Sequence, residues 1–163
     1  MTLHRLDDRA WGFDSNCFVC APGNEHGLRI PFFYDDEAGL VRAEYALGPA
    51  FSGPPKYVHG GVTLAILDDA MAWATIASTQ AFAFTRTTTT AFLRPVLVGR
   101  PHRVEARVLG RAEEGSLKVA AVVLDGEDKR CVEARAEFST VSAEQARSAI
   151  GEVTAADAVY LGH

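Results

Sequence analysis

The pattern of hydrophobic and polar positions in this chain changes its period twice. Residues 28–34 and 40–47 are short apolar runs separated by an acidic turn, and in the second run charged residues alternate with apolar ones. This pattern is typical of two strands joined by a tight turn. Residues 61–78 are rich in alanine and contain no proline, so they predict one long helix.

Alternation returns after the helix. Four further strands are expected, separated by turn-forming residues: 82–93, 102–109, 117–124 and 131–141. Two strands, one long helix and then four strands indicate an α+β fold in which an antiparallel sheet curls over a single helix. Because such a sheet has uncovered edges and an uncovered outer face, we expect the chain to form dimers.

The length of the chain suits one domain. Turn-forming residues are frequent in residues 1–27, which we expect to form an ordered but irregular loop leading into the domain of residues 28–141. In residues 142–163, a Ser-Ala-Glu-Gln capping box predicts a short helix near Ala143. The tail after Gly151 has little to bury and is expected to be mobile.

The formal net charge of −5, from 16 Lys and Arg and 21 Asp and Glu, comes without a basic block, so a nucleic-acid partner is not expected. The longest apolar stretch, residues 58–77, is interrupted by glycines, threonines and two aspartates. We therefore expect neither a membrane span nor a signal peptide. Three cysteines in such a chain suit a reducing compartment, and the cytoplasm is the expected location.

Cys17 and Cys20 form a Cys-x-x-Cys pair, which is half of a zinc site. Completing the site would take two further ligands, and His26 or Asp14 could serve only in an unusual arrangement. We therefore interpret the two residues as buried thiols in a tight turn and expect no metal site.

The predicted helix contains two adjacent acids, Asp68 and Asp69, within an otherwise apolar run. A buried carboxylate is unfavourable unless it is paired, hydrogen-bonded or functional, so both acids need a reason. Gly60 and Gly61 open the helix, where free N–H groups form a partial positive end suited to an oxyanion. Asp68 follows Gly61 by two helical turns, about 10 Å, which is too far for both to reach one carbonyl within a single chain.

Three motifs follow one another along the chain. Residues 17–28 contain Cys-Phe-Val-Cys, then an Asn at position 24 and a Gly-Leu pair; residues 58–61 read Val-His-Gly-Gly, with Asp68 nine residues after the histidine; residues 92–95 read Phe-Leu-Arg-Pro. In this combination the chain resembles the hotdog-fold acyl-CoA thioesterases, in particular the PaaI-like and 4-hydroxybenzoyl-CoA thioesterase branch. The resemblance implies a hotdog fold, a curved antiparallel sheet wrapped around one long central helix.

The resemblance further implies hydrolysis of an acyl-CoA thioester to a free carboxylic acid and CoA, with CoA as part of the substrate and no cofactor. It gives Asp68 the role of general base or nucleophile, and it gives the Gly60 amide, with Gly61 as a second candidate, that of the oxyanion hole. In hotdog dimers the acid of one subunit faces the glycine end of the other, so a homodimer or a homotetramer would resolve the distance. Asp69 is expected to pair with a cation or to cap a backbone group.

Thr85 stands ten residues before Pro95, where similar thioesterases carry a Ser or Thr that orients water, although it could equally be one more β-branched strand residue. His59 is expected to brace the turn through hydrogen bonds rather than to act as a base. Ser52 stands where related thioesterases often carry Gln or Asn, and its shorter side chain would need a water to reach the substrate.

An apolar acyl group, medium-chain or aromatic, is expected to lie against the helix and the aromatics Phe82, Phe84 and Trp73. Cations that could meet the phosphates of CoA lie near predicted strand and loop ends: Lys56, Arg94, Arg100 and Arg103. Two other hypotheses stay open. One is a non-catalytic hotdog protein that binds acyl-CoA or a related metabolite, and the other is a hotdog hydratase or dehydratase, whose Asp-x-x-x-x-His element is absent from this sequence.

Overall fold

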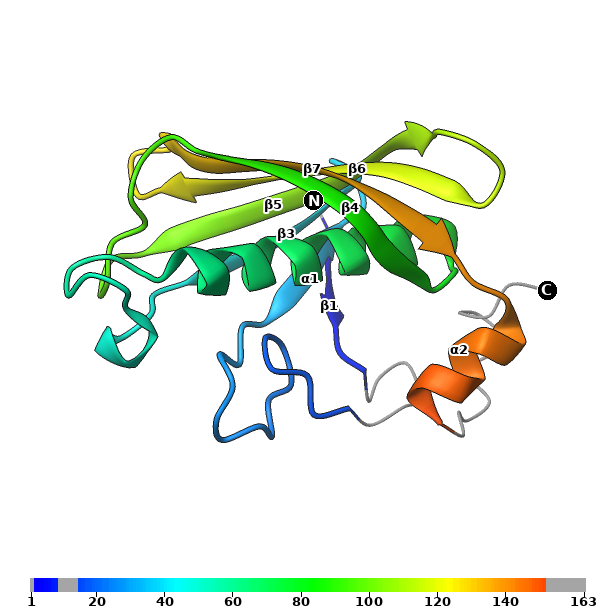
Figure 1. Ribbon diagram of the computed structural model, residues 1–163, viewed down its shortest axis with the longest axis horizontal. Helices are drawn as coiled ribbons and strands as arrows, with labels where there is room; N and C mark the ends of the chain where they lie inside the picture. Colours follow the sequence, from blue (N-terminus) through cyan, green and yellow to red (C-terminus); the bar gives the residue numbers. More distant parts are fainter. Residues whose placement is uncertain (1, 9–14, 152–163) are drawn as a thin grey trace.

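The computed structural model describes residues 2–8 and 15–151, which form one antiparallel sheet, one long helix and one short helix (Figure 1). The strands are β1 (Leu3–Leu6), β2 (Phe32–Asp35), β3 (Leu40–Tyr45), β4 (Ala83–Phe92), β5 (His102–Arg111), β6 (Ser116–Asp125) and β7 (Arg130–Thr140). The helices are α1 (Gly60–Thr79) and α2 (Ala143–Ile150), and a 3-10 turn, η1, covers Pro49–Phe51.

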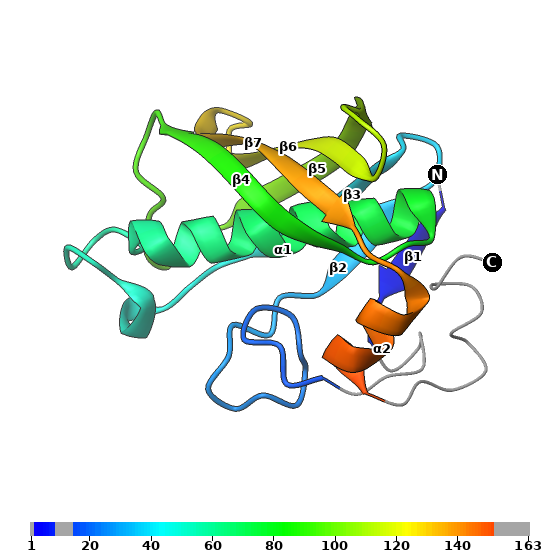
Figure 2. The same cartoon turned by 45° about the vertical axis from the view of Figure 1, so that its right-hand side comes forward.

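The strands lie in the order β1-β2-β3-β5-β6-β7-β4, and each neighbouring pair is antiparallel. α1 connects β3 to the edge strand β4 and lies against the concave face of the curved sheet (Figure 1). The loop of residues 15–31 and α2 lie on the other side of α1 from the sheet (Figure 2). The predicted α+β fold, a curved antiparallel sheet around one central helix, is confirmed.

The core forms between α1 and the inward-facing positions of the sheet. Alternate residues of the central strands are buried, as the period of two predicts, and α1 contributes several buried side chains: Ile66, Leu67, Ala70, Met71, Trp73 and Ala74. In the described part of the chain, α1 is the single helix that is long and apolar enough to cross a membrane, and half of that apolar stretch is buried within this chain. The apolar composition of α1 is what a helix covered on two sides needs in order to be buried in the protein.

The irregular structure predicted for residues 1–27 is wrong at Leu3–Leu6, which pair with β2 as an edge strand. In this strand only the last residue is buried, so its hydrophobic pattern is too weak to predict it. The expected strand over residues 28–34 begins later, at Phe32, because the N–H groups of Leu28 and Ile30 donate to carbonyls of the preceding loop at 2.8 and 2.9 Å.

The other predicted strands and α1 agree with the structure within two residues at each end. α2 begins at Ala143 with the predicted capping box, in which Ser142 and Gln145 each bond to the other's backbone N–H. The tail after Gly151, which we expected to be mobile, lies outside the described residues. Asp14, considered as a metal ligand, also lies outside them.

Candidate functional site

The first turn of α1 is closed by the side chain of His59. Its Nδ1 accepts a hydrogen bond from the Gly61 N–H at 2.9 Å, and its carbonyl accepts from Val62 and Thr63, so the expected brace is present. The Gly61 N–H is therefore already used, which corrects the expectation that it could serve as an oxyanion donor. Within the described residues the Gly60 N–H makes no hydrogen bond, so it is the amide that is free to bind a ligand.

The two glycines are constrained differently. A Cβ on Gly61 would lie 3.1 Å from Nδ1 of His59, so the capping ring would have to shift by a few tenths of an ångström. A Cβ on Gly60 would lie 3.6 Å from the Phe92 ring, which is an ordinary contact. The cap therefore favours glycine at position 61, whereas packing does not require glycine at position 60.

Asp68 is exposed and points toward β4. Thr85, near the start of that strand, donates a hydrogen bond from Oγ1 to Oδ1 of Asp68 at 2.6 Å. A short bond from a hydroxyl to a carboxylate is strong and holds the carboxylate in one orientation. The structure thus brings together two of the predicted site residues that lie 17 positions apart in the sequence.

A β-bulge in β4 makes this contact possible. Strict alternation would place Thr85 and Thr88 on opposite faces of the sheet. The register against β7 shifts between Thr85 and Thr87, so that Thr85 pairs with Phe138 and Thr88 pairs with Ala136. Because Phe138 and Ala136 are both buried on the helix side, the bulge brings both threonines to the face that looks toward α1.

A pocket of about 360 Å³ lies between α1 and β4 beside the Asp68 carboxylate. Most of its wall is apolar, and its lining residues are Gly61, Leu64, Ala65, Leu67, Asp68, Met71, Thr88 and Thr90. An apolar groove with few polar groups is typical of a small-molecule site. A larger hollow of about 520 Å³ on the outer face of the sheet contains none of the predicted site residues.

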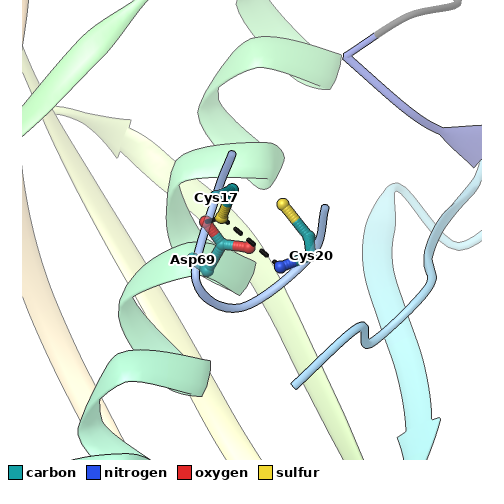
Figure 3. Close-up of side chains that lie close together, drawn as sticks. All are labelled: Cys17, Cys20 and Asp69. Carbon is teal, nitrogen blue, oxygen red and sulfur yellow. Dashed lines mark hydrogen bonds between the residues drawn. The ribbon is translucent and has the colours of Figure 1, made fainter. Parts of the chain in front are cut away.

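Asp69 lies on a different side of α1, under the loop of residues 15–31. The Cys17 thiol donates a hydrogen bond from Sγ to Oδ1 of Asp69 at 3.6 Å (Figure 3). Oδ2 of Asp69 is buried and makes no hydrogen bond within the described residues. Among those residues no ion pair or backbone cap involves Asp69, and the partner that they supply is a thiol.

The three groups around Asp69 perturb one another's pKa. Burial and the neighbouring Cys17 sulfur raise the pKa of the Asp69 carboxyl well above its usual range. A hydrogen bond from the Cys20 thiol lowers the pKa of Cys17 to about 6, although burial opposes this shift. The same bond, together with burial, raises the pKa of Cys20.

Trp73 does not join the Asp68 group. It follows Asp69 by four positions and therefore shares its side of the helix, where its side chain interacts with Cys20. Only 4% of Trp73 is exposed, so in this chain it offers no surface to an acyl group beside Asp68.

Three other predicted substrate-contacting residues lie outside the pocket lining. The Ser52 hydroxyl donates to the Pro49 carbonyl at 2.8 Å and so closes the 3-10 turn. Phe82 is partly buried against the core, and its carbonyl accepts a hydrogen bond from Val141 at 3.0 Å. Phe84 is half exposed.

The cations proposed for the CoA phosphates differ in their availability. Arg103 forms ion pairs with Glu105 and Asp128, each at 2.8 Å, so it is already engaged. The other three are exposed: Lys56, Arg94 and Arg100.

The sequence did not predict that Cys17 and Cys20 lie next to Asp69. The available signal was a second acid in an apolar helix, with no cation at helical spacing, in a chain that also carries a Cys-x-x-Cys turn. That signal indicates a partner for Asp69 but not its position, because Cys20 and Asp69 are 49 positions apart in the sequence.

A model of the thioesterase superfamily matches residues 56–132, a range that includes His59, Asp68 and Thr85. No curated protein sequence matches the chain significantly.

Several solved structures share the fold. A thioesterase superfamily protein is 22% identical, with a TM-score of 0.68 over 74% of this chain, and the chain covers only 58% of that protein. A putative thioesterase related to phenylacetic acid degradation, from Ralstonia eutropha JMP134, is 29% identical, with a TM-score of 0.60 over 70% of this chain and 86% of its own. A Streptococcus mutans UA159 protein bound to acetyl CoA is 16% identical, with a TM-score of 0.59 over 63% of this chain and 82% of its own. The chain is thus similar to the thioesterase superfamily over residues 56–132, and its curved antiparallel sheet around one central helix is the hotdog fold of these solved structures.

Proposed function

We propose that the chain hydrolyses an acyl-CoA thioester to a free carboxylic acid and CoA. The observation that carries this proposal is the 2.6 Å hydrogen bond that orients the exposed Asp68 carboxylate beside an apolar pocket. The match of residues 56–132 to the thioesterase superfamily supports thioester chemistry, and the acetyl CoA bound to the Streptococcus mutans neighbour supports a CoA ligand.

Asp68 is suited to activate water. Thr85 holds Oδ1, and Oδ2 makes no hydrogen bond within the described residues. In the proposed reaction Oδ2 takes a proton from water as the water oxygen attacks the thioester carbonyl carbon; the C–S bond then breaks, and the CoA sulfur takes up a proton. Direct attack by Asp68 would instead form an anhydride, and a single turnover in oxygen-18 water separates the routes, because hydrolysis of that anhydride at the aspartyl carbon labels the protein.

The free Gly60 N–H, at the positive end of α1, is suited to bind the developing oxyanion. Asp68 lies eight residues further along the helix, about 12 Å away, so the two groups of one chain cannot act on one carbonyl. We therefore propose a site shared between two chains, with the amide from one and the carboxylate from the other.

The surface around β4 supports such a homodimer. β4 is an edge strand with one unpaired side, and apolar residues next to it are exposed: Leu64 (37%), Phe92 (54%) and Leu93 (54%). An unpaired edge beside exposed apolar groups favours association. A second copy related by a two-fold axis would cover both the edge and the open side of the pocket.

The first test measures thiol release from short, long and aromatic acyl-CoAs by the wild type, Asp68→Asn and Glu114→Gln. The amide cannot take the proton, so kcat of Asp68→Asn should fall by about 10²–10⁴-fold. Its thermal midpoint should hold because Asp68 is exposed. Glu114 is exposed in the loop between β5 and β6, and its variant should behave as the wild type. Full activity of Asp68→Asn would refute the assignment, and CoA binding without thiol release by the wild type would indicate a binding protein.

A second test removes one amide. Gly60 is the first residue of α1, a position that tolerates proline, and proline has no N–H. The ψ of 134° at His59 is the extended value that a residue before proline prefers. Gly60→Pro should lower kcat by about 10²–10³-fold. Gly60→Ala keeps the N–H and should retain most of the activity; equal loss in both variants would contradict the role of the amide.

Mixing the two inactive variants tests whether the site is shared. If the amide and the carboxylate come from different chains, each mixed dimer of Asp68→Asn and Gly60→Pro has one intact site. Random exchange should then restore about one quarter of the wild-type activity. No recovery, with exchange demonstrated on differently tagged chains, would place both groups in one chain.

A further inference from the structure

Three metal-binding side chains meet on the side of α1 that faces the N-terminal loop. Cys17 and Cys20 come from the loop and Asp69 comes from the helix (Figure 3). The two sulfur atoms and a carboxylate oxygen all lie within 4.8 Å of one another. Thiolate and carboxylate are both common zinc ligands.

The spacing of these atoms fits a tetrahedral ion. With zinc about 2.3 Å from sulfur and about 2.1 Å from oxygen, a sulfur and an oxygen ligand lie about 3.6 Å apart. Sγ of Cys17 and Oδ1 of Asp69 are 3.6 Å apart. The Cys17–Asp69 pair already has the separation that a shared zinc ion requires, and the Cys20 sulfur lies within 4.8 Å of the Cys17 sulfur and of a carboxylate oxygen of Asp69.

The loop is arranged to stabilise the thiolate of Cys17, the form that binds metal, once the thiol has lost the proton that it donates to Asp69. Its Sγ accepts hydrogen bonds from the backbone N–H groups of Val19 at 3.4 Å and Cys20 at 3.3 Å, which favour the thiolate. The turn is packed tightly, because a Cβ on Gly27 would lie 2.6 Å from the Phe18 carbonyl oxygen.

The charge balance of the cluster also indicates a cation. Oδ2 of Asp69 is buried without a hydrogen bond, and no ion pair reaches Asp69 from residues 2–8 or 15–151. A carboxylate buried beside two thiols is unfavourable as an anion, so it either takes up a proton or is compensated by a positive charge such as a metal ion.

We propose that Cys17, Cys20 and Asp69 bind one zinc ion, with water in the fourth position. The third protein ligand is Asp69 of α1, not His26 of the loop, which is exposed and outside the cluster. Soft sulfur ligands select zinc over magnesium or calcium. The ion would fasten the loop to α1 on a side of the helix away from Asp68, and the proposal does not depend on thioester hydrolysis.

The test uses the full chain, reduced and then equilibrated with Zn²⁺ or Co²⁺ alone. After removal of excess metal, the wild type should retain one zinc per chain. The cobalt form should show a thiolate-to-cobalt charge-transfer band and the visible bands of a tetrahedral site. Bound zinc should raise the thermal midpoint, because the metal binds the folded chain.

Variants locate the ligands. Cys17→Ser and Cys20→Ser should lose the zinc and the charge-transfer band, and Asp69→Asn should bind zinc at least about tenfold more weakly against a competing chelator. Cys131→Ser, which removes the buried cysteine of β7, and Asp68→Asn, which changes the adjacent acid, should each keep one zinc per chain. The proposal would be overturned if the wild type held no stoichiometric zinc, gave no tetrahedral cobalt spectrum, or formed a Cys17–Cys20 disulfide in place of the zinc site. Zinc retained after loss of both cysteines would also overturn it.

Discussion

Asp68 and Asp69 are adjacent in the sequence, yet their surroundings have little in common. Asp68 is exposed, accepts a hydrogen bond from Thr85 and borders an open apolar pocket. Asp69 lies under the N-terminal loop beside Cys17, and burial raises the pKa of its carboxyl well above the usual range. A rotation of about 100° between successive helical residues is enough to turn one toward β4 and the other toward the loop.

This difference separates two kinds of use for an acid in an apolar helix. The carboxylate that is open to solvent can meet a substrate, so its changes should appear in kcat. The carboxylate covered by the loop can meet only what the loop brings to it, so its changes should appear in stability and in metal content. Each of the following predictions asks whether the two sides of α1 can be altered separately.

The largest effect is expected from Thr85→Val, which has a similar shape but no hydroxyl to hold Asp68. A hydrogen bond to a charged group contributes about 1.5–3 kcal/mol, so kcat for thioester hydrolysis should fall roughly 10–100-fold while zinc content is unchanged. Thr85→Ser keeps the hydroxyl and is the matched control. If steady-state kinetics gave the same kcat for both variants, the hydrogen bond would have no part in the reaction.

On the other side of the helix, Gly27→Ala should act on stability. The added Cβ would lie 2.6 Å from the backbone oxygen of Phe18, so the loop must move, and urea unfolding should show a loss of about 1–3 kcal/mol. The kcat of the folded protein should stay at the wild-type value. Gly126→Ala is the control, because no atom lies within 4 Å of its Cβ position. Equal stabilities of the two variants would mean that the loop yields easily.

A smaller effect on stability is expected at the start of α1, where the helix end belongs to neither the Asp68 side nor the Asp69 side alone. In Gly61→Ala the new Cβ would crowd Nδ1 of His59, and loss of the cap should lower the free energy of unfolding by about 1 kcal/mol. Gly48→Ala adds the same group in open space and should cost less. Urea unfolding of the two variants measures this difference in stability. Indistinguishable midpoints would mean that the cap has no measurable role.

The smallest effect concerns pH and should come from the sheet rather than from either aspartate. Burial lowers the pKa of His102 below 6.5, although the Arg100 carbonyl opposes this shift. The neutral ring is therefore favoured by folding, so this contribution is complete above pH 6.5 and is lost as the pH falls and the unfolded chain takes up the proton first. As the pH is lowered from 7.5 to about 5, the thermal midpoint should fall less in His102→Gln than in the wild type. His26→Gln, which changes an exposed ring, is the control and should behave as the wild type. The same slope in all three proteins would exclude His102 as the source.

Much of the fold could be predicted because the relevant signals are local. The period of two in the later strands, the alanine-rich run of α1 and the capping box of α2 each lie within one short stretch of sequence. β1 could not be predicted in this way, because its four residues become a strand only by pairing with β2.

The candidate site was predictable in part. The spacing from His59 and from Pro95 singled out Asp68, which lines the pocket, and Thr85, which donates a hydrogen bond to Asp68. The use of the Gly61 N–H by His59 was not predictable, since it depends on the angle at which the side chain meets the helix end.

The amino-acid sequence was thus sufficient to identify the central helix, its two acids and the glycines at its start, because propensity and periodicity act over a few residues. Folding decided which neighbour each acid acquired. A bulge in β4 turned Thr85 toward Asp68, and a loop from the beginning of the chain brought Cys17 to Asp69. Both contacts depend on how distant segments pack against α1, and a pattern confined to one segment contains no information about that packing.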